Sequence, residues 1–232
     1  AIRHAPIKKA DYPNGGQMHL WGGADGGAVP TGPAALLSIM TPVAQQVEWL
    51  ARQEATYLIT YPSNLEAMLR HCQDKKIRFP TLREVQTMSE LLKPSTRELC
   101  REVWDVPVTD IYTCQEVGYI ALQCPGHQHY HAQSENMIIE VLKGDGSPAR
   151  AGETGKVVIT HLHNFASPLI RYDIGDFAEV GEPCPCGRNL PVLKRIVGRV
   201  RGMVTLPNGD QFWPFFSNRK FIEVAPVRQY QI

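Results

Sequence analysis

The sequence lacks a surplus of charge of either sign and lacks a long apolar run. Its 232 residues carry 24 lysines and arginines against 23 aspartates and glutamates, a formal net charge of +1. This balance gives no general attraction to nucleic acid or to a membrane surface. No apolar stretch is as long as a membrane span, and the first residues lack the apolar core of a signal peptide. We therefore expect a cytoplasmic protein that binds neither nucleic acid nor membrane.

The sequence also has few cysteines. Six are spread over the chain, and four of them have no close neighbour. A disulfide framework is usually denser and belongs to short secreted chains, so this scatter favours a reducing compartment with room for one metal site.

Up to Gly118 the chain alternates between two hydrophobic patterns. Three segments with a proline in the first turn have apolar residues at helical spacing, and three short runs are rich in β-branched and aromatic residues. Such alternation predicts parallel strands joined by crossover helices, an α/β fold with a partly parallel sheet and flanking helices. The predicted helices are 41–53, 62–75 and 93–104, and the predicted strands are 56–61, 82–88 and 107–113.

After Gly118 the pattern changes to short strand-like runs separated by turn residues. This spacing is typical of an antiparallel sheet or a barrel. We expect an α/β part over residues 1–118 and a β-rich, barrel-like subdomain over residues 119–198. The predicted strands of the second part are 136–142, 155–162, 167–173, 176–181 and 193–200.

The stretch EPCPCGRN places Cys184 and Cys186 one residue apart. So short a ring is too tight for relaxed disulfide geometry, and two thiolates provide half of a tetrahedral zinc site. The stretch QCPGHQHYHAQ supplies Cys124 and a histidine. We predict a structural zinc held by Cys124, His131, Cys184 and Cys186.

Which histidine binds the metal stays open among His127, His129 and His131. The alternative interpretation is that the cysteines are small buried apolar residues and that the histidines line an exposed strand. A catalytic zinc would need an open coordination position with a base nearby, and nothing in the sequence requires one.

Several stretches occur in a familiar order. In this order, the chain resembles the adenylate-forming superfamily and, within it, the phenylacetate–CoA ligase and capsular-polysaccharide-type branch. The resemblance extends from about residue 40 to the end of the chain. The stretches that carry it are WLARQEATYLITYPSNLEAML, TLREVQTMSELL, DIYTCQEVG, QCPGHQHYH, GETGKVVITHLHNFASPLIRYDIGD, CPCGR and GRVRGMVTLPNGDQFWP.

The resemblance implies an acid–thiol ligase. Such an enzyme converts a carboxylic acid and ATP, with magnesium, into an acyl-adenylate and then transfers the acyl group to coenzyme A or a carrier thiol. The chain starts without Met and shows no phosphate-binding loop before residue 40. We expect an internal fragment of the large domain that cannot complete the reaction alone, with exposed apolar surface that could pair two copies.

Four candidate site residues of the first part follow from the resemblance. Tyr112 matches the aromatic residue that packs on adenine, and Glu116 matches the catalytic acid that helps to hold magnesium. Ser89 and Glu90 match a turn whose backbone lines the adenine pocket. Taken singly, Tyr112 is also an ordinary strand aromatic and Glu116 an ordinary solvated acid.

Two further candidates lie near the end of the chain. Asp176 matches the carboxylate that receives both ribose hydroxyls, and Arg199 matches the arginine near the ribose and the hinge. The resemblance thus makes residues 199–232 the hinge and the start of a truncated C-terminal domain. Read alone, Asp176 is a turn former and Arg199 part of a solvated basic run.

The chain departs from the branch at several positions, and the departures at Thr113, Gln115, Arg201 and Gly202 favour a second hypothesis. Thr113 replaces a glycine, Gln115 replaces a hydroxyl residue, and Asp173 stands in place of an arginine. Arg201 and Gly202 stand where the branch has paired aspartates. The alternative is a zinc-stabilised scaffold or partner-binding module of the same fold that has lost adenylation.

A third hypothesis is a nucleic-acid-binding β-domain with basic residues and stacking aromatics. The balanced charge and the absence of a wider basic stripe oppose it. Its residues would be Lys194, Arg195, Arg199, Arg201, Phe212 and Trp213.

Overall fold

The structure is a computed structural model that describes two compact units. Unit 1 is Ala1–Gln133 and unit 2 is Ser134–Ile232. The predicted hinge positions Arg201 and Gly202 lie outside the described residues, as do Trp213 and the side chain of Phe212. The described residues are 1–3, 10–21, 31–199, 204–207 and 211–212.

Unit 1 is built on a mixed sheet with the strand order β4-β5-β6-β7-β8. The first three strands are parallel, and β7 and β8 are antiparallel to their neighbours. This arrangement confirms the α/β fold with a partly parallel sheet. The strands are β4 (Tyr57–Thr60), β5 (Glu84–Met88), β6 (Val108–Cys114), β7 (Gly118–Gln123) and β8 (Tyr130–Ala132).

A small three-stranded sheet precedes this main sheet in the chain. Strand β3 (Ala34–Ser38) lies between β1 (Ile2–Arg3), with which it is parallel, and β2 (Gly16–Met18), with which it is antiparallel. Its central strand contributes the fully buried Leu37 to the core of unit 1.

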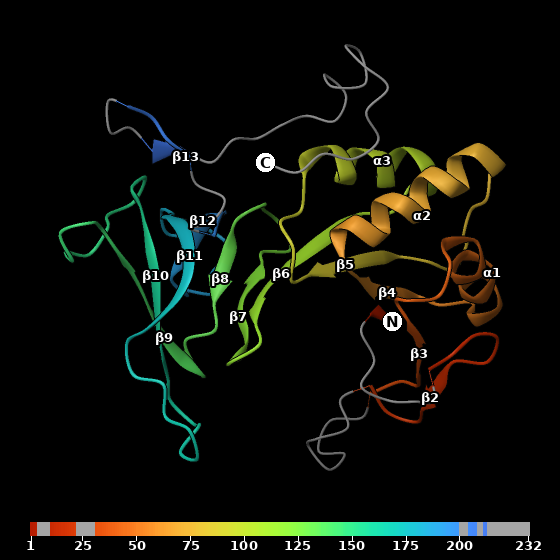
Figure 1. Cartoon of the computed structure of the whole chain (residues 1–232), viewed down its shortest axis with the longest axis horizontal. Coiled ribbons are helices and arrows are strands. Elements are labelled where there is room, and N and C mark those ends of the chain that lie inside the picture. Colours follow the sequence, from red (N-terminus) through yellow and green to blue (C-terminus); the bar gives the residue numbers. More distant parts are fainter. Residues whose placement is uncertain (4–9, 22–30, 200–203, 208–210, 213–232) are drawn as a thin grey trace. The chain divides into compact units, whose positions relative to one another are not determined.

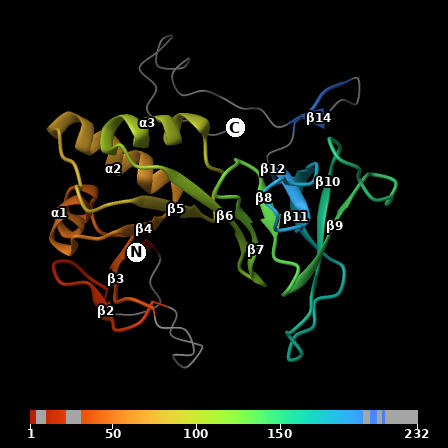
Figure 2. The same cartoon turned by 180° about the vertical axis from the view of Figure 1, so that it is seen from behind.

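Three helices follow the strands of unit 1: α1 (Val43–Gln53), α2 (Pro62–Lys75) and α3 (Pro94–Trp104). A proline opens α2 and α3, because its fixed φ suits the first turn, where no N–H partner is needed. Helices α2 and α3 lie side by side in Figures 1 and 2. The three predicted helices are therefore confirmed.

The core of unit 1 lies between these strands and helices. Phe79 meets the edge of Trp104 with ring centroids 5.0 Å apart, a favoured aromatic geometry. The strands contribute Leu58, Val85 and Val108 to this cluster, and the helices contribute Leu50, Leu65, Met68, Leu69, Cys72, Cys100 and Trp104.

Unit 2 is an antiparallel sheet with the order β12-β11-β10-β9. Its strands are β9 (Met137–Leu142), β10 (Thr154–His161), β11 (Tyr172–Val180) and β12 (Val192–Arg199), followed by a short ribbon of β13 (Val204–Thr205) and β14 (Gln211–Phe212). The β-rich second part is confirmed. Among the described residues of unit 2 the sheet is open, because β9 pairs with β10 and not with β12, so the barrel-like closure is not found.

The structure corrects one predicted strand of unit 2. Residues 167–171 are not part of a strand, and the strand begins at Tyr172. Arg171 has a φ of 47°, in the left-handed region, and this conformation interrupts an extended run. The predicted strand 176–181 is then the continuation of the same strand β11, which ends at Val180.

The first unit extends past Gly118, because β7 pairs with β6 and β8 pairs with β7. The division of the chain into functional parts at residues 118 and 198 stays a prediction. Within the described part of the chain, the helices are all too short or too polar to cross a membrane.

Candidate functional site

The parallel strands of unit 1 end at one edge of the sheet, and four predicted site residues lie there. In open α/β sheets, ligands bind at the carboxyl ends of the strands, where the strand order or direction changes. Ser89 and Glu90 follow β5, Tyr112 lies near the end of β6, and Glu116 lies in the turn after it. Strand β6 is parallel to β5 and antiparallel to β7, so the direction changes at this point.

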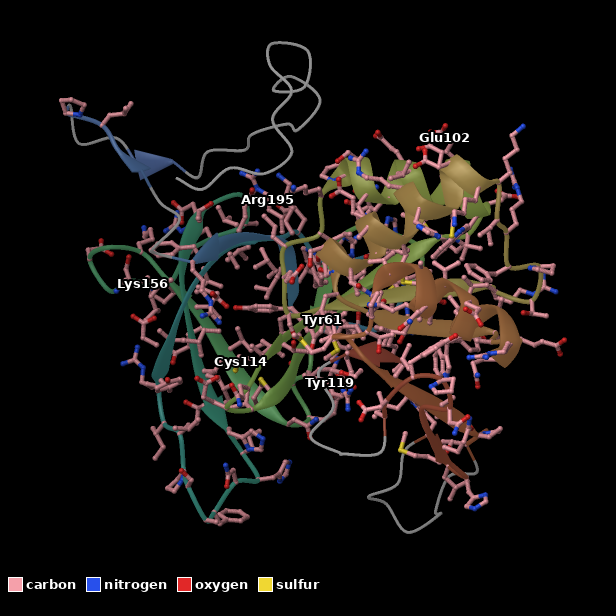
Figure 3. All side chains as sticks on the ribbon, turned by 45° about the vertical axis from the view of Figure 1, so that its right-hand side comes forward. Tyr61, Glu102, Cys114, Tyr119, Lys156 and Arg195 are labelled. Carbon is pink, nitrogen blue, oxygen red and sulfur yellow. The ribbon has the colours of Figure 1, made fainter. Side chains whose placement is uncertain are left out.

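Tyr61, Cys114 and Tyr119 mark this edge in Figure 3, at the end of β4, the end of β6 and the beginning of β7. The register pairs Cys114 with Gly118 and places Tyr119 opposite Thr113. Burial raises the pKa of the Cys114 thiol, so this thiol is less acidic than an exposed one.

Tyr112 is a buried residue of β6, with 7% of its surface exposed. Side chains alternate along a strand, so Tyr112 shares a face with Val108 and Asp110, which are also buried. The predicted adenine contact of Tyr112 stays a prediction, and in this structure the ring is largely covered by protein.

The turn after β5 is held by a strained residue. Ser89 has a φ of 67°, in the left-handed region that a non-glycine residue rarely adopts. Its Oγ lies 3.4 Å from Oγ1 of Thr113, the residue that departs from the branch glycine. The Thr113 hydroxyl thus joins the loop after β5 to strand β6.

Glu90 has a structural partner that the sequence did not suggest. Its carboxylate accepts hydrogen bonds from the backbone N–H and from the hydroxyl of Ser63, both at 2.9 Å. Ser63 lies in the first turn of α2, where backbone N–H groups lack helical partners and a negative charge is favourable. The Glu90 side chain therefore caps α2, whereas its backbone stays in the turn after β5.

Glu116 is exposed in the turn between β6 and β7. An exposed carboxylate at the carboxyl end of a parallel strand is accessible to a hydrated cation, which keeps several of its waters when the cation is magnesium. This placement fits the predicted role and does not test it.

Unit 2 brings its two predicted site residues together. Asp176 of β11 and Arg199 of β12 are directly opposite in the antiparallel register. Nε of Arg199 lies 3.3 Å from Oδ1 of Asp176; the Asp176 side chain is buried and the Arg199 side chain is 57% exposed. A buried carboxylate beside an accessible guanidinium can receive hydroxyl donors and hold a neighbouring phosphate.

Three candidate metal ligands meet in the hairpin of β7 and β8. The ligand atoms of Cys124, His129 and His131 lie within 4.8 Å of one another. Cys124 directly follows β7, and His131 lies in β8. The backbone N–H of Cys124 donates to the carbonyl of His129 at 2.8 Å, so the hairpin itself brings the ligands together.

His129 has chemistry that suits a metal ligand. Its Nε2 is buried and has no hydrogen-bond partner among the described residues. Burial and the neighbouring imidazoles of His127 and His131 lower the pKa of His129, which favours the neutral, metal-binding form. The His127 and His129 rings stack with centroids 5.0 Å apart, but His127 is not part of the cluster. Of the three candidate histidines, His129 and His131 lie in the cluster, and the metal ligand stays a prediction.

The other predicted ligands, Cys184 and Cys186, lie in the turn between β11 and β12 of unit 2 and are both half-buried. No disulfide joins any of the six cysteines, all of which lie in the described part. This agrees with the prediction that the pair does not bond to itself.

The sequence did not predict a buried polar network in unit 1, which is centred on Asp110. The Asp110 carboxylate accepts hydrogen bonds from the hydroxyls of Thr87 at 2.5 Å and Tyr130 at 2.7 Å. The signal was present, since Asp110 stands between Val108 and Tyr112 on the buried face of a predicted strand. A carboxylate at such a position requires buried donors.

Coenzyme A ligases are similar to this chain in sequence and in fold. No family model matches the chain. Over 106 residues the chain is 32% identical to a phenylacetate–coenzyme A ligase of Thermus thermophilus, which corresponds to 44% of this chain and 24% of that protein. The chain therefore spans about a quarter of the length of that curated relative.

Solved structures of coenzyme A ligases have the same fold. An open conformation of 2-hydroxyisobutyryl-CoA ligase, in complex with 2-HIB-AMP and CoA, matches 77% of this chain with a TM-score of 0.67 and 22% identity, over 45% of its own length. The anthranilate CoA ligase AuaEII, in complex with anthranoyl-AMP, matches 79% of this chain with a TM-score of 0.60 and 19% identity, over 37% of its own length.

A long-chain-fatty-acid-CoA ligase of Archaeoglobus fulgidus matches 74% of this chain, and 40% of its own chain, with a TM-score of 0.56 and 15% identity. At these identities the structural matches show the fold. Together with the sequence match and the motifs, they show that this chain has the fold of part of an adenylate-forming coenzyme A ligase and is similar in sequence to the phenylacetate–CoA ligases.

Proposed function

We propose that the protein containing this chain activates a carboxylic acid with ATP as an acyl-adenylate and transfers the acyl group to coenzyme A or another thiol. The observation that carries the proposal is the buried Asp176 carboxylate beside the exposed Arg199 guanidinium. The names of the similar proteins, which are CoA ligases, support the same chemistry.

The reaction has two displacements. A substrate carboxylate oxygen forms a bond to the α-phosphorus of ATP, and the bond from that phosphorus to the bridging oxygen breaks, so pyrophosphate leaves. A thiolate sulfur then attacks the acyl carbon, and AMP leaves with the electron pair of the broken C–O bond. Both steps need a fixed nucleotide and stabilised charge on the α-phosphate.

The residues of unit 2 supply the fixed point for the nucleotide. In the proposal, Asp176 accepts the two ribose hydroxyls, and Arg199 holds Asp176 in place and faces the phosphate side. Strand pairing between β11 and β12 sets both side chains, so the nucleotide would bind to a rigid element.

The residues of unit 1 supply the other contacts of the proposal. Glu116 would hold magnesium, whose charge offsets that of the phosphates. Tyr112 and the backbone at Ser89 and Glu90 would contact adenine, and the observed cap on α2 keeps the turn at Glu90 in place.

Pyrophosphate exchange tests the reaction most simply. The full-length protein is assayed for ATP–pyrophosphate exchange with aryl, fatty and amino acids. We expect exchange that depends on one class of acid and is lost in Asp176→Asn. The matched control is Glu140→Gln, which removes the same charge from a half-buried carboxylate of β9 that pairs with Arg171, and leaves pyrophosphate exchange unchanged.

The scaffold hypothesis is the other outcome of this assay. The contact of Thr113 with Ser89 and the burial of Tyr112 favour it, because both fill the edge where adenine would lie. Folded protein that shows no pyrophosphate exchange with any acid of the panel would contradict the ligase proposal and favour the scaffold.

We also propose a structural zinc. The supporting observation is the convergence of Cys124, His129 and His131 in one hairpin, with the buried Nε2 of His129 among them. Cys184 and Cys186 stay the sequence-based candidates for the remaining ligands. When bound, a structural zinc would supply a cross-link that orders loops with little core of their own.

Metal analysis and alkylation test the zinc. Protein purified without chelator should contain one equivalent of zinc, and the half-buried Cys184 and Cys186 should react with iodoacetamide only after chelation. Cys100, whose pKa burial raises to about 12, is the internal control that stays unmodified in both states. Substoichiometric zinc in folded protein would contradict the proposal.

A further inference from the structure

The buried network around Asp110 has one face toward the hairpin that carries the metal ligands. Tyr130, which donates to Asp110, stands between His129 and His131 in the chain. Any displacement of the two histidine backbones therefore moves the residue that satisfies the Asp110 carboxylate.

A second connection runs through Gln123, the residue before Cys124. Its Oε1 accepts hydrogen bonds from the Asp110 backbone N–H at 2.9 Å and from the Arg97 guanidinium at 2.7 Å. Its Nε2 donates to the carbonyl of His127 at 3.3 Å. Gln123 and Tyr130 are paired in the register of β7 and β8. The two hydrogen bonds that join this hairpin to Asp110 therefore come from neighbouring positions.

The same network also includes residues of β5 and β6 that lie close in sequence to the predicted adenine contacts. Asp110 precedes Tyr112 by two residues on β6, and Thr87, its other donor, precedes Ser89 by two residues at the end of β5. The network thus contacts the two strands from which the predicted adenine contacts come.

The bonds of this network are costly to break. Burial raises the pKa of Asp110, since the charged carboxylate is desolvated, and the hydroxyls of Thr87 and Tyr130 oppose this effect. Removing one donor from a buried acceptor leaves its desolvation uncompensated. Strand β6 is therefore stable in the position in which both donors reach Asp110.

We propose that Tyr130, Gln123 and Asp110 are positioning residues that couple metal binding at Cys124, His129 and His131 to the placement of strand β6. A metal fixes the hairpin backbone at three points around Tyr130 and Gln123, and these two residues fix Asp110. The consequence for nucleotide binding rests on the proposed ligase function, whereas the coupling to β6 rests only on the proposed zinc.

Hydrogen exchange of the full-length protein tests the coupling, with zinc as the only added ligand. In the wild type, zinc should slow amide exchange in β6 several-fold relative to the chelated protein. In Tyr130→Phe, which keeps the ring and removes the hydroxyl, this protection should be lost. The matched control is Tyr119→Phe, which removes an exposed hydroxyl from the same hairpin and should keep the protection.

Coupling is reciprocal, so the same variant should bind zinc about tenfold more weakly in competition with a chelator. A ligand variant, Cys124→Ala, gives an independent measurement, because it should raise exchange in β6 and leave β4 unchanged. Equal zinc protection of β6 in Tyr130→Phe and the wild type would overturn the proposal. The same holds if β6 does not respond to zinc, or if Cys124→Ala leaves its exchange unchanged.

The nucleotide readout separates this proposal from the ligase proposal. Zinc-dependent protection of β6 without any pyrophosphate exchange would mean that the coupling exists and the ligase assignment fails. ATP–pyrophosphate exchange without any response of β6 to zinc would mean that the ligase assignment holds and the coupling fails.

Discussion

Units 1 and 2 stabilise buried carboxylates in different ways. In unit 1, Asp110 accepts hydrogen bonds from two neutral hydroxyls. In unit 2, Asp176 and Glu179 lie on β11 and face Arg199 and Arg195 across the sheet. The hydrogen bonds to Asp110 come from neutral groups, whereas those to Asp176 and Glu179 come from cations and are stronger when the carboxylate is charged. We therefore expect the stability of unit 2, more than that of unit 1, to depend on the charge of its buried acids.

The cores differ in the same direction. Unit 1 buries a continuous apolar cluster with members from Ile2 to Val108. Among its described residues, unit 2 buries fewer apolar side chains: Met137, Val141, Val157, Val158, Ile159, Ala178, Val192 and Leu193. A region with more burial gains more from apolar contact, so polar pairs contribute a larger share of the stability of unit 2.

The largest expected effect is a cavity in unit 1. Leu69 of α2 is fully buried, so Leu69→Ala should lower the free energy of unfolding by about 2–5 kcal/mol. Urea unfolding measures the change. Phe165→Ala in unit 2, at a site 85% exposed, is the control and should change it by less than about 0.5 kcal/mol. Similar losses from both variants would remove the contrast between the cores.

The next effect concerns Glu179, whose carboxylate lies 2.6 Å from both Nζ of Lys194 and Nε of Arg195. The hydrogen bond from Lys194 lowers the pKa of Glu179, with Arg195 adding to it. Because the folded-state pKa lies below the unfolded value of about 4.3, the stabilisation is present above that pH. It is lost as the pH falls through the folded pKa.

Glu179→Gln should therefore cost about 1.5–3 kcal/mol at pH 7 and little at pH values below the folded pKa. Urea unfolding across pH measures both values. Glu140, which is half-buried and pairs with the exposed Arg171, gives the control, and Glu140→Gln should change the free energy of unfolding by no more than about 1 kcal/mol at either pH. A loss that is the same at low and neutral pH would show that charge is not the cause.

The smallest effect concerns the cap on α2. Glu90→Ala removes the acceptor of the Ser63 N–H and hydroxyl, and should cost about 0.5–2 kcal/mol. Glu98→Ala, at an exposed position of α3, tests whether loss of any surface glutamate has the same effect. Equal costs for the two variants would mean that the cap contributes nothing specific.

The sequence predicted those elements whose signals are local. The helices of unit 1 followed from a proline in the first turn and apolar spacing, and both signals act within one element. The predicted strand at residues 167–173 was wrong at its start. Arg171 has a left-handed φ of 47° and donates hydrogen bonds to Thr160 and Glu140, and no local pattern shows these tertiary contacts.

The residues of the candidate site that lie within the motifs of the resemblance could be predicted from the sequence. The order of these motifs brought out Asp176 and Arg199, which the structure then showed to be cross-strand partners. The Glu90 cap and the Tyr130 bond to Asp110 join residues 27 and 20 positions apart, so they depend on tertiary contacts that no local pattern encodes.

Titration of AMP into the full-length protein tests the central claim, that Asp176 holds the nucleotide, most directly. Loss of the charge should remove strong hydrogen bonds to the ribose, so Asp176→Asn should bind AMP at least about tenfold more weakly than the wild type. Glu140→Gln should bind AMP as the wild type does. Equal AMP affinity in Asp176→Asn and the wild type would contradict the claim.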